Sequence, residues 1–415
     1  MLFIAYLVFF CWLITRVKFI ANSGISKRIL ISLFVIKVLA GTIYGYIYRY
    51  IPNHQVYADT WRFFYESKTE TDLLFQNPGE YFINIFHNPY EKGYQHFFSG
   101  HASYWSDLKS NFMVKLVSLL NILSFKHYYI NVILFSFISF LGPIALYRLF
   151  LKVFPGKEVW LIIGCFLFPS FLYWCSGIHK DGLIFTGIAL IMFHLDKITS
   201  EEGYSFKRGF YIFLCFLLIF PLRNYVALAL IPPIAAWLLT QKIPQKKWLV
   251  FSLVYIICGV LFFTSRFIHP KINLPLSVSI RQDEFLKLKG SSFIKTNKLL
   301  PGFKSFVKNL PQAINHSLLR PYPTEIKSVF YLLASVEVIF YCLILLWFAA
   351  RGNYKVFSQP SVLFSLFFSF SLLLLIGYTI PFIGAIVRYR GILLPLFITP
   401  LLCNIKKINS GINIL

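Results

Sequence analysis

Apolar residues are grouped in long blocks along this chain, and short polar segments separate the blocks. Most blocks approach the roughly 20 residues that a helix needs to cross a bilayer. We therefore predict an all-α integral membrane protein with about eleven transmembrane helices. The predicted spans are 1–16, 28–48, 128–150, 159–177, 182–196, 209–222, 225–240, 248–264, 328–350, 358–378 and 391–405.

The basic residues between these blocks predict an orientation. Short connections on one side hold seventeen Lys or Arg, whereas those on the other side hold only Lys180, Arg223, Arg388 and Arg390. Cytoplasmic loops collect Lys and Arg, so the N-terminus is predicted outside and the C-terminus in the cytoplasm. An odd number of spans agrees with this orientation.

Two long segments fall on the predicted outer face. Residues 49–127 are rich in aromatic and acidic side chains, and residues 265–327 are basic. In the first, residues 111–125 carry apolar side chains at helical spacing, which predicts an interfacial helix on the outer leaflet. We interpret residues 1–415 as a single polytopic transmembrane domain that includes both segments.

The composition supports this class. Apolar residues make up 57% of the chain and charged residues 13%, with a mean hydropathy of +0.67. Soluble proteins usually contain about 25% charged residues. The net charge of +24 is then interpreted as an uneven distribution of cations across a membrane, and no nucleic-acid partner is expected. The seven cysteines lie in apolar runs without metal-ligand spacing, so we expect no disulfide framework. No basic region precedes the first apolar run, which favours a retained anchor over a cleaved signal peptide.

A short polar turn, His179-Lys180-Asp181, interrupts two of the apolar blocks. Charges at membrane depth cost about 3 kcal/mol or more unless they are paired or hydrated, so they are candidates for function. The structural alternatives are that Asp181 is the N-cap of the next helix and that Lys180 extends to the headgroups.

Three further cations lie at the same predicted boundary, namely Arg223, Arg388 and Arg390. Together with Lys180 they would make an anion site suited to a lipid-linked phosphate or pyrophosphate. Two more charges, Lys37 and Glu337, fall inside predicted spans. They either pair with each other or line a polar cavity.

Asp59 is the carboxylate that we predict to act as a general base towards an acceptor hydroxyl, just outside the bilayer. The alternative is that Asp59 caps a helix beginning near Trp61. The histidines of the same outer segment lack tight ligand spacing, so the sequence does not support a metal site there. They are His54, His87, His96 and His101.

Several short motifs resemble those of a known class. Pro169-Ser170, Ser176-Gly177-Ile-His-Lys180-Asp181, Leu319-Arg-Pro-Tyr-Pro-Thr-Glu325, Ala334-Ser-Val-Glu337 and Val387-Arg-Tyr-Arg390 occur in that order. This arrangement resembles the GT-C class of integral-membrane glycosyltransferases and bacterial membrane proteins of cell-surface polysaccharide loci. Thr324 stands where an aromatic residue is usual, and Ala58 and Thr60 flank Asp59 where many GT-C enzymes have a second acid.

The resemblance implies a multi-pass protein of the bacterial inner membrane with a GT-C-like helical bundle. Its activity would be outer-face glycosyl transfer, or polysaccharide polymerisation, from a polyprenyl-phosphate-linked donor to a glycan or lipid acceptor. Membrane lipids are further partners, and no cofactor or metal is expected. Asp59 would be catalytic, and the substrate and its phosphate would contact His179, Lys180, Asp181, Arg223, Arg320, Arg388 and Arg390. The alternative function is a transporter or flippase for an anionic lipid-linked or small anionic substrate.

Overall fold

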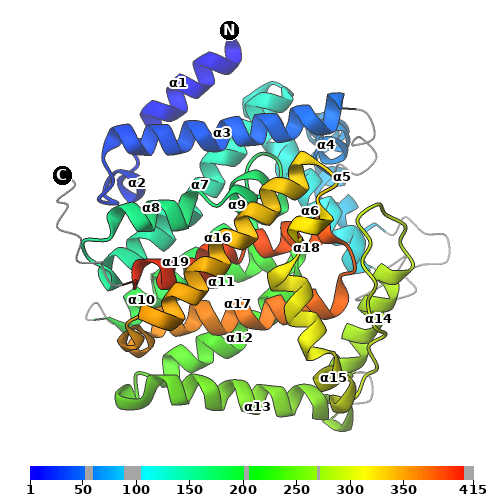
Figure 1. Cartoon of the computed structure of the whole chain (residues 1–415). Coiled ribbons are helices and arrows are strands. Elements are labelled where there is room, and N and C mark those ends of the chain that lie inside the picture. The colour runs from blue at the N-terminus through cyan, green and yellow to red at the C-terminus, as the bar shows by residue number, and fades with distance from the viewer. Residues whose placement is uncertain (52–58, 88–103, 201–204, 269–271, 406–415) are drawn as a thin grey trace. The chain divides into compact units, whose positions relative to one another are not determined.

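The computed structural model describes residues 1–51, 59–87, 104–200, 205–268 and 272–405 (Figure 1). Throughout these ranges the chain forms helices and no strand. The β pairing described is limited to two isolated bridges, Phe293 with Phe382 and Gly352 with Ile405. The all-α part of the predicted fold is therefore confirmed.

Helices occupy most of the described chain. Those of the first part are α1 (Leu2–Ile14), α2 (Lys18–Ala21), α3 (Lys27–Tyr50), α4 (Asp59–Gln76), α5 (Pro78–Ile83), η2 (Asn84–Phe86), α6 (Tyr104–Ser124), α7 (Tyr128–Val153), α8 (Glu158–Phe166), α9 (Pro169–Trp174), α10 (Lys180–Thr199) and α11 (Phe206–Leu222). They continue with α12 (Asn224–Leu239), η3 (Pro244–Lys246), α13 (Lys247–Ile268), α14 (Leu274–Leu286), α15 (Phe303–Ile314), η4 (Asn315–Leu319), η5 (Pro323–Glu325), α16 (Val329–Arg351), η6 (Tyr354–Ser358), α17 (Pro360–Thr379), α18 (Ile383–Gly391) and α19 (Leu394–Cys403).

The contacts between residues divide the chain into two compact units. Unit 1 consists of residues 1–148 and 171–228, and unit 2 of residues 149–170 and 229–415. Each unit is described by itself below. The interpretation of residues 1–415 as a single domain stays a prediction.

Six helical segments are long and apolar enough to cross a membrane. They are α3, α7, α10, α13 with the preceding turn, α16 and α17. The pair α18 and α19, bent by 60° at a short break, would make a seventh, and α1 and α12 are shorter apolar helices. These helices support a multi-pass membrane protein, but the predicted count of about eleven spans is not confirmed.

The prediction of one span over residues 159–177 is wrong. This run forms α8, of 9 residues, and α9, of 6 residues, and both are far shorter than the roughly 20 residues that a span needs. Pro169 explains the break, because it lacks an N–H to continue the ladder of α8 and disfavours helical backbone at the preceding residue. A hydropathy window averages over such an interruption and therefore misses it.

Two glycines one turn apart bring α3 close to its neighbours in unit 1. A Cβ atom on Gly41 would lie 2.6 Å from the backbone nitrogen of Gly177, and one on Gly45 would lie 2.5 Å from the ring of Tyr128. Only residues without side chains allow such approach, and small residues at this spacing are typical of packed membrane helices. The Gly41–Gly45 pair therefore positions α3 against the turn that precedes α10 and against the start of α7.

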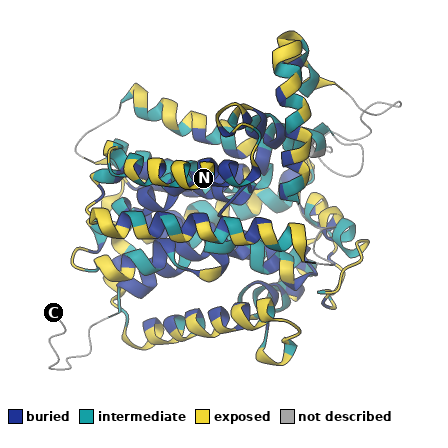
Figure 2. Cartoon of the chain, turned by 90° about the horizontal axis from the view of Figure 1, so that it is seen from above, coloured by how far each residue is buried: buried dark blue, intermediate teal, exposed yellow. Residues whose placement is uncertain are grey.

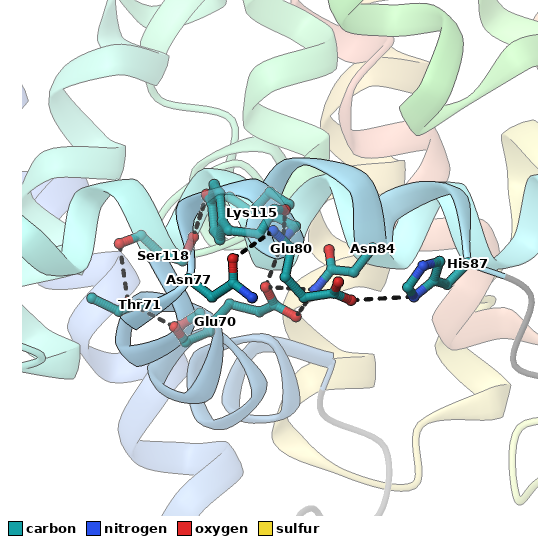
Figure 3. A network of polar contacts seen from close by, with 10 residues as sticks. Glu70, Thr71, Asn77, Glu80, Asn84, His87, Lys115 and Ser118 are labelled. Carbon is teal, nitrogen blue, oxygen red and sulfur yellow. Dashed lines mark hydrogen bonds and ion pairs between the residues drawn. The ribbon is translucent and has the colours of Figure 1, made fainter. Parts of the chain in front are cut away.

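The segment between α3 and α7 forms a polar helical layer of its own. The carboxylate of Glu70 on α4 accepts hydrogen bonds from Lys115 Nζ on α6, at 2.5 Å, and from Asn84 Nδ2, at 3.1 Å (Figure 3). The Tyr81 hydroxyl lies 2.8 Å from Ser118 Oγ. The predicted helix over 111–125 is confirmed within α6, which begins earlier, at Tyr104; its place on the outer leaflet stays a prediction.

Replacing Lys115 by Met should loosen this layer. Lys115 bonds both Glu70 and the carbonyl of Tyr81, and the Lys115 and Glu70 side chains are only 14% and 22% exposed. Losing such a charged bond costs about 1–2 kcal/mol. Hydrogen exchange in α4 and α5 should therefore become faster.

A matched control for this variant is Lys126→Met, because Lys126 pairs with Asp72 but the two side chains are 36% and 54% exposed. Exposed pairs contribute less than about 1 kcal/mol, so exchange should change little. Equal acceleration of exchange in both variants would contradict the role given to Lys115.

In unit 2, α17 contacts α13, α14, α15 and α19. A Cβ atom on Gly377 would lie 1.9 Å from the carbonyl oxygen of Ala313, so α17 and the end of α15 meet backbone to backbone. In the apolar stretch that contains α13, only 22% of the residues are buried, as expected of an apolar helix that faces lipid. Exposed residues follow the outer sides of several helices in Figure 2, and buried residues gather on the sides facing other helices.

Candidate functional sites

The turn His179-Lys180-Asp181 forms the start of α10. His179 is the N-cap, and its Nδ1 lies 3.3 Å from the Asp181 backbone N–H. The alternative that Asp181 is the N-cap is therefore wrong, because Asp181 lies inside the first turn. An acidic residue there is favoured by the helix dipole.

The carboxylate of Asp181 is the centre of a buried ionic cluster in unit 1. Its Oδ1 is paired with Nη2 of Arg223, which follows α11, and its Oδ2 lies 2.9 Å from Nδ1 of His179. The shorter contact favours a proton on Nδ1 that His179 donates to the carboxylate, over the longer contact with the backbone N–H. All three side chains are buried. The pairing of these groups with one another offsets the cost of burying their charges.

Lys37 supports the same turn from α3. Its Nζ donates a hydrogen bond of 2.6 Å to the carbonyl of Cys175, and Gly177 has a positive φ of 74°. A Cβ atom on Gly182 would also lie 2.6 Å from the Cys175 carbonyl. Lys37 therefore acts on backbone in unit 1, and Glu337 has a backbone partner in unit 2, as described below.

Aromatic rings surround the His179 side of this cluster. The ring of Tyr44 lies 5.6 Å from that of His179 and 5.2 Å from that of Tyr173, and the ring of Trp174 lies 6.0 Å from His179. Tyr48 extends the group, with its ring 4.7 Å from Tyr44. Tyr48, Tyr173 and Trp174 are partly exposed, so aromatic surface is available beside a buried ionic cluster.

Asp59 lies in the first turn of α4, which also contains Thr60 and Trp61, so the alternative that it caps a helix beginning near Trp61 is not confirmed. Two residues after Asp59, Trp61 contacts α3 beside the aromatic rings. Trp61 Nε1 donates to the carbonyl of Gly45, at 2.9 Å, and Gly45 adjoins Tyr44 on α3. Asp59 is itself partly exposed, as a general base acting on a bound acceptor must be.

The predicted meeting of four cations stays a prediction. Lys180 and Arg223 belong to unit 1, and Arg388 and Arg390 belong to unit 2. In each unit, one of the two cations is partly exposed and the other is buried. Lys180 and Arg388 are partly exposed, whereas Arg223 and Arg390 are buried.

Arg390 is wholly enclosed in unit 2. Its Nη1 donates to the carbonyls of Ser317 and Arg320, at 3.0 and 2.7 Å, and its guanidinium carbon lies 5.4 Å from the centre of the Tyr341 ring. Within the described ranges, Nε and Nη2 form no hydrogen bond. The edge formed by these two nitrogens is one that binds carboxylates and phosphates in a bidentate manner.

Glu337 connects three of the sequence motifs in unit 2. Its Oε2 accepts a hydrogen bond of 2.8 Å from the Ser170 N–H, and its charge interacts with that of Arg390. A Cβ atom on Gly391 would lie 3.2 Å from Ser170, so α18 lies directly against this residue. The segments around 169–170, 334–337 and 387–390 are therefore neighbours in the folded unit.

Arg320 belongs to the same neighbourhood because its carbonyl accepts a hydrogen bond from Arg390. Its side chain has a carboxylate partner of its own. Its Nη1 pairs with Glu325 Oε1, and the Tyr322 N–H donates to Glu325 Oε2 at 2.9 Å. Burial, together with the Arg320 charge, lowers the pKa of His316 to about 4. His316 is therefore neutral at pH 7, and the cations of this neighbourhood are arginines.

No group of three or more potential metal ligands occurs among the residues with a described placement. Of the outer-segment histidines, His54, His96 and His101 lie outside the described residues. His87 lies 3.4 Å from Glu80.

Sequence reasoning missed the two glycines that bring α3 against the turn before α10. The Gly41-x-x-x-Gly45 spacing in α3 was the available signal, since it predicts a close helix contact. The aromatic group of Tyr44, Tyr48 and Tyr173 had no such signal, because aromatic residues are common throughout the chain and are expected at membrane interfaces.

Comparisons with models of protein families, with curated proteins and with solved structures found no match.

Proposed function

We propose that this protein transfers a sugar or oligosaccharide from a polyprenyl-phosphate-linked donor to a glycan or lipid acceptor on the outer face of a bacterial inner membrane. The protein would then be a glycosyltransferase or polysaccharide polymerase of cell-surface polysaccharide or glycoconjugate biosynthesis. A transporter or flippase of an anionic lipid-linked substrate is the competing function.

One observation supports the proposal: in unit 1 the first turn of α4, which contains Asp59, contacts α3 next to the aromatic rings that lie beside His179. Trp61, two residues after Asp59, donates a hydrogen bond to the carbonyl of Gly45, and the ring of the neighbouring Tyr44 lies 5.6 Å from that of His179. Aromatic faces bind the apolar faces of sugar rings, and a partly exposed carboxylate can accept a proton from a hydroxyl group. These are the requirements for placing an acceptor sugar beside a base.

The cations have two roles in this proposal. Lys180 follows the N-cap of α10 and is partly exposed, so it is suited to a phosphate of the donor. Arg223 is held by Asp181 and keeps the start of α10 in place. Cations that contact the donor phosphate would stabilise the charge that develops on it as the sugar is transferred.

Asp59→Asn should lower the turnover of the transferase by roughly 100-fold or more, because a positioned general base contributes about 10²–10⁴-fold to rate. Affinity for the lipid-linked donor should remain close to that of the wild type. The measurement is sugar transfer by purified protein from a polyprenyl-linked donor to a glycan acceptor.

Glu66→Gln is the matched control, since Glu66 lies on the same helix and forms an exposed pair with Arg62. Its turnover should stay within a few-fold of wild type. Full activity of Asp59→Asn would remove the general-base role, and the absence of transfer by the wild type would remove the proposed function.

A further inference from the structure

Two buried charged side chains of unit 2, Arg390 and Glu337, have polar atoms without a hydrogen-bond partner in the described part of the chain. Nε and Nη2 of Arg390 are donors without a partner in the described part of the chain, and Oε1 of Glu337 is an acceptor without one. The hydroxyl of Ser335 also has no hydrogen-bond partner there. The side chains of Arg390, Glu337 and Ser335 are at most 3% exposed. Leaving buried polar atoms unpaired costs about 1–3 kcal/mol each, so such a concentration indicates a place for a partner.

The two unused edges specify different chemical groups. The Nε–Nη2 edge of an arginine matches two oxygens of a phosphate or carboxylate. The Glu337 oxygen needs a hydroxyl or N–H donor. Serine hydroxyls can serve either group. A phosphate joined to a sugar supplies an oxyanion and hydroxyl donors in one ligand.

The surrounding contacts hold both charges in place. Nη1 of Arg390 is fixed by the carbonyls of Ser317 and Arg320, and Oε2 of Glu337 is fixed by the Ser170 N–H. Each charged group thus uses some of its polar atoms for contacts within the protein and keeps others without a hydrogen bond in the described part of the chain. This division between anchoring and open sides is typical of preorganised binding residues.

We propose that Arg390 and Glu337 form a binding site in unit 2 for a glycosyl phosphate, with the phosphate on Nε and Nη2 of Arg390 and a sugar hydroxyl on Oε1 of Glu337. This inference rests on the proposed function, because the ligand is the sugar-phosphate group of the proposed donor. Glu337 is then a residue that distinguishes glycosylated from bare lipid phosphate.

The test measures binding of two probes to the purified full-length protein, farnesyl phosphate and farnesyl phosphate esterified with glucose, galactose or N-acetylglucosamine. Arg390→Lys should weaken binding of both probes roughly tenfold or more, because a lysine cannot form the bidentate contact. Glu337→Gln should leave farnesyl phosphate binding unchanged and weaken binding of the glycosylated probes several-fold. Its amide oxygen can still accept the Ser170 N–H.

A further test variant and a control keep the test decisive. Ser335→Ala removes an unpaired hydroxyl with little change of shape, so it should weaken binding without unfolding the protein. Arg351→Lys, a substitution at the end of α16, should bind like the wild type. If Arg390→Lys does not fold, Glu337→Gln and Ser335→Ala decide the outcome.

Wild-type affinity for both probes in Glu337→Gln and Ser335→Ala, or equal weakening of both probes in Glu337→Gln, would overturn the inference. Transfer activity separates this failure from failure of the proposed function. If transfer occurs and these variants bind normally, the inference alone is wrong. If no transfer occurs but the glycosylated probe binds through Arg390 and Glu337, the transferase function alone is wrong.

Discussion

Asp181→Asn is expected to destabilise the protein by about 3 kcal/mol or more, because it leaves the buried charge of Arg223 without its carboxylate. The substitution keeps the shape of the side chain, so the loss reports on charge. The change in stability is measured by unfolding the purified protein in mild detergent with heat or with denaturant. Activity should fall with it, since Asp181 also holds His179 at the start of α10.

A double-mutant cycle identifies the cause. Arg223→Met alone also leaves a buried charge unpaired, whereas Asp181→Asn combined with Arg223→Met removes both charges. The double variant should therefore be less destabilised than the sum of the two single variants, with a coupling of about 1–3 kcal/mol. Asp72→Asn, which disrupts an exposed ion pair, should change stability by less than about 1 kcal/mol. Strictly additive effects at 181 and 223 would contradict the pairing.

Gly41→Ala should destabilise the protein by about 1–3 kcal/mol through overpacking. The new methyl group would lie 2.6 Å from the Gly177 nitrogen, and this contact is with backbone, which cannot rotate away. Because Gly177 precedes His179 by only two residues, the start of α10 should shift as well. The same unfolding assay measures stability, and sugar transfer measures the effect on the site.

The control for this variant is Gly259→Ala in α13, where an added Cβ atom would have nothing within 4 Å. Alanine favours helix over glycine by up to about 1 kcal/mol, so this variant should be as stable as the wild type or slightly more stable. A tolerated Gly41→Ala with normal transfer would show that the close approach of α3 to the Gly177 turn is not required.

Hydropathy predicted the long spans well and the broken ones poorly. The runs that became α3, α7, α10, α13, α16 and α17 are uninterrupted, so their length and apolar character were sufficient. Residues 159–177 and 391–405 are as apolar, but the first is divided before Pro169, and the second begins at the 60° bend between α18 and α19. A window of mean hydropathy registers composition, whereas a break depends on local backbone constraints.

The candidate site shows the same limit. Intramembrane charge singled out Asp181, Arg223, Glu337 and Arg390 because burial of charge is costly. Their partners were not predictable, since Arg223 pairs with a residue on another helix and Glu337 binds backbone more than 160 positions away. Arg223 is paired with Asp181, and its predicted contact with phosphate stays a prediction. Such contacts are set by tertiary packing, which one sequence does not disclose.

Product formation and transport in the same sealed proteoliposomes test the central claim most directly. Purified wild-type protein would be reconstituted with a polyprenyl-linked sugar donor and a glycan acceptor, with empty liposomes and Asp59→Asn vesicles alongside. We predict glycosylated acceptor in the wild-type vesicles, a loss of roughly 100-fold or more in the Asp59→Asn vesicles, and no movement of the donor between leaflets beyond that in empty liposomes. Movement of the donor across the bilayer without any glycosylated product would contradict the account and establish the transport function in its place.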